Sequence, residues 1–119
     1  MRVVGLNKHD KYVEERPWGS FEQFTHNEES TVKILTIKAG GLLSYQVHKL
    51  RIELWRIIEG EGHIILNDKR IDVKPGDEFL IKPGDKHRIG SESGLKFLEI
   101  SFGHFDEADE VRLEDAYGR

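Results

Sequence analysis

The chain has 119 residues, of which 37% are hydrophobic and 34% are charged, and its net charge is −4 with acidic and basic residues interspersed. This length suits one domain, the charge pattern offers no basic stripe for a nucleic-acid backbone, and the absence of cysteine excludes disulfides and thiolate metal sites. No apolar run is long enough for a membrane helix, and the N-terminus has no signal-peptide pattern. We therefore expect a cytoplasmic protein without nucleic-acid or membrane partners.

Short apolar runs of strand length recur along the chain and are separated by turn-forming residues. The runs cover residues 20–24, 31–37, 42–47, 54–58, 63–66, 70–73, 78–81, 86–89 and 95–102. Two Pro-Gly-Asp turns flank the run 78–81, because proline presets φ and glycine accepts a positive φ. This spacing predicts an all-β sandwich or barrel in a single domain.

The two ends of the chain differ from this strand pattern. Residues 1–19 are interpreted as an N-terminal arm and first-strand lead-in, in which Trp18 is expected to act as a hydrophobic plug on the sandwich. The β-barrel itself is expected over 20–104. The acidic tail, 105–119, is expected to pack on the barrel as a short helix or an ordered arm.

Four side chains form a candidate metal site. Gln46 and His48 are two residues apart, so that on a strand both face the same side. Glu53 follows a bend, and His87 follows the second Pro-Gly-Asp turn. Imidazole, carboxylate and amide groups suit a borderline divalent ion, and two histidines with one glutamate occur in catalytic zinc sites. We expect one divalent metal per chain, with zinc first and manganese, iron, cobalt or nickel as alternatives.

The spacing of these residues resembles the cupin pattern. Gly40, Gln46, His48, Glu53 and Gly60 follow the first cupin motif, with glutamine where most cupins have a first histidine. The second motif is matched by a later set: Gly76, Pro83, Gly84 and His87. The resemblance implies a cupin double-stranded β-helix, which is a jelly-roll β-sandwich.

Nearly the whole chain resembles the small cupins of the type II phosphomannose isomerase family. The matching stretches are 16–19, 46–48, Arg51, Glu53, Trp55, 83–88 and 111–119. The resemblance implies metal-dependent interconversion of mannose 6-phosphate and fructose 6-phosphate, a role in GDP-mannose biosynthesis, and Gln46 as a genuine ligand. The chain departs from the family at Lys49, Leu50 and Leu54, where relatives often have histidine, and this departure bears on substrate handling.

An isomerase needs a base for the C1–C2 proton and cations for the sugar phosphate. Glu99 is the candidate base, and Lys33 is a second catalytic candidate that could instead polarise an oxygen. The candidate substrate-binding residues are Arg51, Arg88, Arg112 and Arg119. Strand alternation turns Arg88 away from its neighbour His87, which argues against a direct contact between Arg88 and the substrate.

Two other functions stay open. The chain could be another metal-dependent cupin enzyme, acting on a sugar nucleotide or another small molecule, or it could be a non-catalytic metal- and sugar-binding cupin. Alternation also places Leu54 and Ile58 on the outer face, with Arg56 between them. An apolar outer face on a domain of this size predicts a homodimer.

Overall fold

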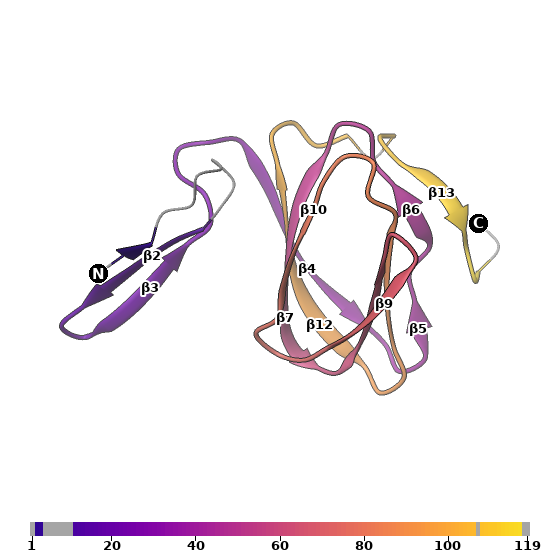
Figure 1. Cartoon of the computed structure of the whole chain (residues 1–119), viewed down its shortest axis with the longest axis horizontal. Helices are drawn as coiled ribbons and strands as arrows, with labels where there is room; N and C mark the ends of the chain where they lie inside the picture. Colours follow the sequence, from indigo (N-terminus) through magenta and orange to yellow (C-terminus); the bar gives the residue numbers. More distant parts are fainter. Residues whose placement is uncertain (1, 4–10, 107, 118–119) are drawn as a thin grey trace.

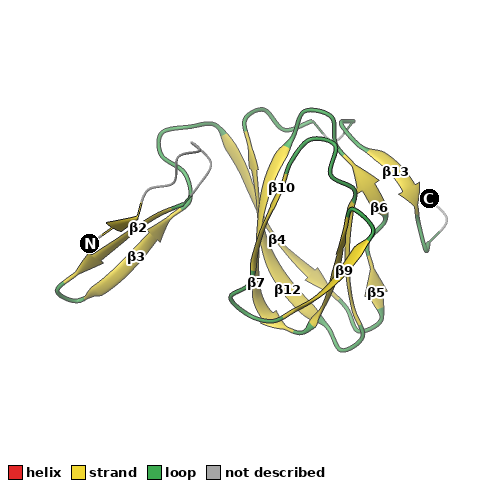
Figure 2. Cartoon of the chain, in the orientation of Figure 1, coloured by secondary structure: helices red, strands yellow, loops and turns green. Residues whose placement is uncertain are grey.

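The computed structural model describes residues 2–3, 11–106 and 108–117, and all of its regular elements are β-strands (Figure 2). Within this part of the chain there is no helix long and apolar enough to cross a membrane. The strands are β1 (Arg2–Val3), β2 (Tyr12–Arg16), β3 (Gly19–Gln23), β4 (Ser30–Ile37), β5 (Gly41–Leu42), β6 (Tyr45–Val47), β7 (Ile52–Gly60), β8 (Gly62–Leu66), β9 (Lys69–Val73), β10 (Glu78–Ile81), β11 (His87–Ser91), β12 (Leu95–Phe102) and β13 (Val111–Glu114). The predicted all-β fold is confirmed.

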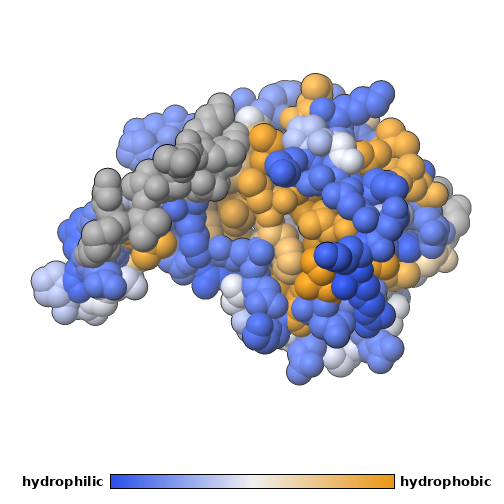
Figure 3. Space-filling view, in the orientation of Figure 1, coloured by the Kyte–Doolittle hydropathy of each residue, from blue (hydrophilic) through white to orange (hydrophobic). Residues whose placement is uncertain are grey.

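Two sheets face each other and form the body of the molecule (Figure 1). One has the strand order β10–β7–β12–β4, and the other has the order β13–β6–β11–β8–β9, with β5 beside β11. All the strand pairs are antiparallel. The space-filling view shows apolar side chains between the two sheets, bordered by hydrophilic surface (Figure 3).

Alternation along the strands builds both an inner core and an apolar outer face. On β12, Phe97 belongs to the inner core, whereas Leu98 and Ile100 belong to a second cluster on the opposite face. The fully buried inner core consists of Ile37, Trp55, Ile57, Ile64, Val73, Ile81, Ile89, Leu95 and Phe97. On the outer face, Val32 and Ile34 are 57% and 63% exposed. The four-stranded sheet therefore carries apolar side chains on both faces.

The N-terminal strands form a separate three-stranded sheet that stands beside the sandwich (Figure 1). Arg16 pairs with Gly19, which leaves Trp18 in the hairpin turn, where it is 72% exposed. The prediction that Trp18 plugs the sandwich is therefore wrong, because the turn directs the residue into solvent. An ion-pair network joins the hairpin to the outer face: Arg56 of β7 lies 2.7 Å from Glu22 of β3 and 3.2 Å from Glu78 of β10.

The two Pro-Gly-Asp turns form as the sequence predicts. Gly76 and Gly84 have positive φ angles of 94° and 88°, which glycine adopts without steric cost. In each turn an aspartate carboxylate accepts a backbone N–H three residues earlier: Asp77 from Lys74 and Asp85 from Lys82, both at 2.9 Å. The second turn sets the position of β11, which begins with His87.

The C-terminal segment contains a strand rather than a helix. β13 pairs with β6, with Arg112 opposite Gln46. Because β6 also pairs with β11 through Gln46 and His87, β13 lies next to strands that carry candidate metal ligands. Strand β13 has only four residues, VRLE, and all four are exposed, so hydrophobic pattern analysis does not single it out.

Candidate metal centre

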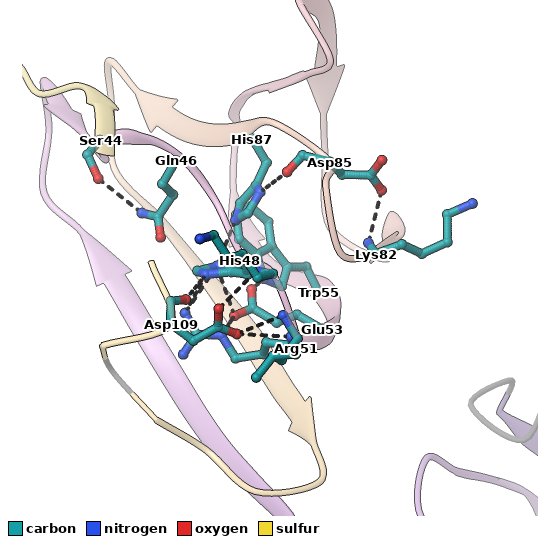
Figure 4. Close-up of polar contacts among 12 residues, drawn as sticks. Ser44, Gln46, His48, Arg51, Glu53, Trp55, Lys82, Asp85, His87 and Asp109 are labelled. Atoms are coloured by element: carbon teal, nitrogen blue, oxygen red, sulfur yellow. Dashed lines mark hydrogen bonds and ion pairs between the residues drawn. The ribbon is translucent and has the colours of Figure 1, made fainter. Parts of the chain in front are cut away.

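Three of the predicted ligands, His48, Glu53 and His87, meet in the interior between the two sheets (Figure 4). Each is buried, with 1–2% of its surface exposed, and their ligand atoms all lie within 4.8 Å of one another. His48 follows β6, Glu53 is in β7 and His87 opens β11. The backbone N–H of Gly84 donates to the carbonyl of His48 at 2.9 Å, so the second Pro-Gly-Asp turn holds the two histidines together.

The imidazole rings are oriented for metal binding. Nδ1 of His48 donates to the backbone carbonyl of Asp109 at 2.7 Å, and Nδ1 of His87 donates to that of Asp85 at 2.9 Å. In the neutral rings, both Nε2 lone pairs then face the site. The two Nε2 atoms are 3.1 Å apart, and Nε2 of His48 is 3.4 Å from Oε2 of Glu53.

The two histidine Nε2 lone pairs and the Glu53 carboxylate converge on one point, an arrangement that a bound cation would stabilise. Atoms bound at the usual ~2.0–2.2 Å from one zinc ion, at roughly 90–110° to each other, are ~3–3.5 Å apart. Two of the three separations, 3.1 and 3.4 Å, lie in this range, and the third is at most 4.8 Å. The residues present therefore fit a divalent metal ion.

Gln46, the fourth predicted ligand, lines the same pocket from β6. Its amide nitrogen donates to the hydroxyl of Ser44 at 3.0 Å, which fixes the orientation of the amide. The amide oxygen is then on the side of His48 (Figure 4). This geometry is consistent with a ligand whose oxygen faces the metal.

Arg51 and Trp55 contact the predicted carboxylate ligand. The indole N–H of Trp55 donates to Oε1 of Glu53 at 2.9 Å, and Nε of Arg51 forms an ion pair with Oε2 at 2.9 Å. The Nη2 atom of Arg51 lies against the His48 ring, 2.8 Å from its Nδ1 atom and 3.1 Å from its Nε2 atom. Arg51 is only 7% exposed, and its Nη1 atom has no hydrogen-bond partner among the described residues. This guanidinium therefore offers a donor inside the site.

These side chains open into a cavity of about 180 Å³. It is lined by Lys33, Leu35, Leu43, Gln46, His48, Arg51, Glu53, Trp55, His87, Glu99, Phe105, Glu110 and Arg112. The cavity is thus formed by both sheets and by the C-terminal segment. Three lysine or arginine side chains and three glutamates border it.

Burial controls protonation in this cavity. It lowers the pKa of His87 to about 4 and also lowers the pKa of His48, so both rings are neutral near pH 7. Burial raises the pKa of Glu53, against the opposing effects of Arg51 and Trp55. Burial, followed by the neighbouring Glu53 carboxylate, raises the pKa of Glu99 to about 7. The site therefore presents neutral histidines beside a carboxyl group that can exchange a proton near neutral pH.

The structure brings both candidate catalytic residues into the cavity. Glu99 of β12 is 8% exposed and stands opposite Lys33 of β4 in the sheet register. The ammonium group of Lys33 lies 4.2 Å from the centre of the Phe105 ring, and the Arg51 guanidinium lies 4.7 Å from that centre. Phe105 thus packs against two of the cations in the cavity.

Two of the four predicted substrate-binding arginines line the cavity. Arg51 and Arg112 line the cavity, and Arg112 forms an ion pair of 2.8 Å with Glu110. Arg88 does not line it, because alternation on β11 points its side chain away from His87. Its guanidinium donates to the Leu43 carbonyl and to Glu114, each at 3.0 Å. Arg119 lies outside the described residues.

Sequence reasoning missed three contributors from the C-terminal segment: Phe105, Asp109 and Glu110. Phe105 and Glu110 line the cavity, and Asp109 contacts the histidine and the loop beside it. They lie far from both cupin motifs in the sequence, in a stretch with no strand pattern, so no spacing rule points to them. The family resemblance includes Trp55 without giving it a role, and in the structure its indole N–H donates to Glu53.

Comparison with known proteins gives a match to one family over residues 5–115, and the family is described as mannose-6-phosphate isomerase C-terminal. The xanthan biosynthesis protein XanB of Xanthomonas campestris pv. campestris (strain B100) is 32% identical over 107 residues, which cover 87% of this chain and 23% of that protein. A mannose-1-phosphate guanylyltransferase of Klebsiella pneumoniae is 33% identical with the same coverage. The chain thus spans about a quarter of the length of these relatives.

Solved structures support the same fold. A cupin protein from Bacteroides fragilis superposes with a TM-score of 0.58 at 27% identity, over 69% of this chain and 76% of that chain. A protein with a double-stranded beta-helix domain from Klebsiella pneumoniae superposes with a TM-score of 0.64 at 22% identity, over 76% of this chain and 78% of that chain. The predicted cupin double-stranded β-helix is therefore confirmed.

These relatives correct the predicted reaction. The sequence favoured a mannose-6-phosphate isomerase, but the relatives that cover 87% of the chain are named for guanylyl transfer to mannose 1-phosphate and for xanthan biosynthesis. The isomerase assignment, both as the function and as the type of enzyme, is therefore wrong, even though the family description contains that word. The metal-ligand frame is common to many cupins and does not specify a reaction. The chain belongs to the family of cupin domains described as mannose-6-phosphate isomerase C-terminal.

Proposed function

We propose that this chain is a metal- and sugar-binding cupin domain that holds one divalent ion through Gln46, His48, Glu53 and His87. It binds a small anionic sugar derivative, a sugar phosphate or a sugar nucleotide, beside that ion. One observation carries the proposal. Two buried imidazole Nε2 atoms, whose Nδ1 atoms are committed to carbonyls, face each other at 3.1 Å next to a buried carboxylate.

The charge of the cavity supports an anionic ligand. The cationic and acidic side chains that line it are equal in number, and the histidines are neutral near pH 7. A divalent ion would leave an excess of positive charge in this cavity, which favours a phosphate-bearing ligand. Arg51 and Lys33 supply donors for its oxygens.

The donor set agrees with zinc first, and manganese, iron, cobalt or nickel accept the same nitrogen and oxygen ligands. When bound, the ion would act as a Lewis acid toward an oxygen of the sugar derivative. The side chains around it have separate tasks. Trp55 and Arg51 orient the Glu53 carboxylate, and Asp85 holds the His87 ring.

The names of the relatives suggest where such a domain works. Guanylyl transfer to mannose 1-phosphate forms GDP-mannose, so mannose 1-phosphate and GDP-mannose are the first ligands to test. In this role the domain serves GDP-mannose biosynthesis in the cytoplasm, and neither a nucleic acid nor a membrane is a partner. The cavity of about 180 Å³ accepts a sugar phosphate more readily than a whole sugar nucleotide, whose nucleoside would extend beyond it.

A second candidate function, a metal-dependent enzyme acting on a sugar nucleotide or another small molecule, is favoured by Glu99. Its carboxyl group lines the cavity, and burial together with Glu53 raises its pKa to about 7. A carboxyl group with such a pKa can both accept and donate a proton near neutral pH. Turnover of a sugar nucleotide that stops with Glu99→Gln would favour this candidate over the binding domain.

A homodimer is the quaternary arrangement that we propose. The outer face of the sheet β10–β7–β12–β4 carries three exposed apolar side chains, Val32, Ile34 and Ile58, on a small domain. The hairpin and Phe24 cover only part of this face, where Leu54 and Arg56 lie. A second copy would bury the remaining apolar side chains.

Elemental analysis and calorimetric titration test the function together. The wild-type chain should bind about one zinc or manganese ion, and mannose 1-phosphate should bind only to the metal-loaded protein. His87→Ala should abolish metal binding. His63→Ala is the matched control, because His63 is a partly buried histidine in a different pocket. A wild-type chain that binds no divalent ion, or a sugar phosphate that binds equally in the presence of chelator, would contradict the proposal.

A further inference from the structure

Asp109, in the C-terminal segment, makes an unusual set of contacts with the loop that joins two predicted ligands. Its Oδ1 atom accepts the backbone N–H of Lys49 at 2.9 Å, and its Oδ2 atom accepts those of Leu50 and Arg51 at 3.0 and 3.1 Å. These three consecutive residues connect His48 to the strand that carries Glu53. One carboxylate therefore fixes the backbone between the two ligands (Figure 4).

The main chain of the same residue orients the ligand itself. The carbonyl oxygen of Asp109 accepts a hydrogen bond from Nδ1 of His48 at 2.7 Å. This bond selects the tautomer whose Nε2 lone pair points toward Glu53 and His87. If the segment moved away, the ring would be free to rotate or to place its proton on Nε2, and either change would spoil a ligand.

The segment that carries Asp109 is also a wall of the cavity. Phe105, Glu110 and Arg112 line the cavity from this side, and β13 then anchors the chain beside β6. The contacts of Asp109 therefore join two structures that are remote in the sequence, the ligand loop 48–51 and the cavity wall 108–112. A change in the order of one must affect the other.

We infer that Asp109 is a positioning residue for the metal centre, and that through it metal binding is coupled to closure of the C-terminal segment over the cavity. The inference rests on the proposed metal-binding function and adds a residue outside the ligand frame. Because coupling is reciprocal, metal binding tightens the wall and a tight wall raises metal affinity. Sequence motifs for metal ligands do not include such a residue.

The test compares Asp109→Ala and Asp109→Asn with wild type and with Asp77→Asn. Asp77 is the matched control, since its carboxylate also accepts a backbone N–H at 2.9 Å but lies in the first Pro-Gly-Asp turn, away from the cavity. Zinc and cobalt affinities are measured by competition with a chromogenic chelator, and the cobalt absorption spectrum reports the ligand geometry. Hydrogen exchange follows the amides of residues 49–51 and 108–112 with and without zinc.

We expect Asp109→Ala to weaken metal binding by about 10- to 100-fold and to change the cobalt spectrum. Asp109→Asn, which keeps one acceptor oxygen, should fall between Asp109→Ala and wild type, and Asp77→Asn should bind metal like wild type. Zinc should slow amide exchange in both segments of wild type. If Asp109→Ala does not fold, Asp109→Asn and the exchange data on wild type decide the question.

Two results would overturn the inference without touching the proposed function. One is wild-type metal affinity and an unchanged cobalt spectrum in a folded Asp109 variant. The other is zinc protection of residues 49–51 with no effect on 108–112. A wild-type chain that binds no metal would instead refute the proposed function, and the inference with it, so the two failures are distinguishable.

Discussion

Replacing Glu99 with glutamine should stabilise the metal-free protein, and the gain should grow with pH. Burial, and then the Glu53 carboxylate, raise the pKa of Glu99 from its ordinary value of 4.5 to about 7 in the folded chain. A raised carboxyl pKa contributes stability below the unfolded value that is lost as pH rises through the folded value. Since one pKa unit corresponds to about 1.4 kcal/mol, the raised pKa lowers the unfolding free energy of the wild type by roughly 3 kcal/mol at pH 8 but by only roughly 1 kcal/mol at pH 5.

Urea unfolding in the presence of EDTA measures this effect at pH 5, 6, 7 and 8. Glutamine has nearly the same shape and cannot ionise, so Glu99→Gln should gain roughly 2 kcal/mol over wild type between pH 5 and pH 8. The control is Glu15→Gln, on an exposed position of β2, which should follow wild type at every pH. A difference between Glu99→Gln and wild type that does not change with pH would refute the reasoning, because a constant offset reflects packing rather than ionisation.

Three further substitutions test the fold and the assembly. Ile34→Glu, on the exposed outer face, should convert a dimer into a monomer with little change in unfolding free energy, as measured by light scattering and urea unfolding; a dimer that persists would contradict the proposed interface. Phe97→Ala should cost about 3–5 kcal/mol of unfolding free energy, because this fully buried ring packs against Trp55 at 4.8 Å between ring centres, and a loss below 1 kcal/mol would argue against that packing. Trp18→Ala should change thermal stability by less than about 0.5 kcal/mol, since the side chain is largely exposed in a hairpin turn; a larger loss would restore the plug that the sequence suggested.

Much of the fold follows from hydrophobic patterning, and the exceptions have a physical reason. Leu95–Phe102 and Glu78–Ile81 are strands with the bounds that the sequence predicts, because their apolar side chains must be buried on at least one face. Strand β3 was predicted over 20–24, close to its observed bounds, but strands β2 and β13 were missed. Both consist largely of partly or fully exposed residues and are specified by backbone pairing rather than by burial. Patterning detects burial, so it cannot detect strands of this kind.

In the candidate site, too, one part was predicted from the sequence and another part was not. The convergence of His48, Glu53 and His87 was predicted from strand alternation together with the resemblance to the cupin motifs. Alternation relates near neighbours, and only the resemblance linked His87 to His48 across 39 residues. The cavity wall was not predictable, since Phe105 and Asp109 reach the site through contacts that span more than fifty residues. Arg88 illustrates a local rule that worked, because alternation directed it to Leu43 and Glu114 rather than to the cavity.

The positions at which the chain departs from its family help to explain why metal binding and reaction type need separate evidence. Leu50 is 84% exposed, and it contacts Asp109 through its backbone rather than its side chain. Leu54 packs in the apolar cluster on the outer face with Ile100. The side chains of Leu50 and Leu54 therefore do not line the cavity, and histidine at either position would not add a ligand without a rearrangement of the loop or the strand. Besides the ligand frame, the cavity is lined by side chains of both sheets, such as Lys33 and Glu99, and by the C-terminal segment. Differences in ligand or reaction among relatives should therefore map to these residues rather than to the missing histidines.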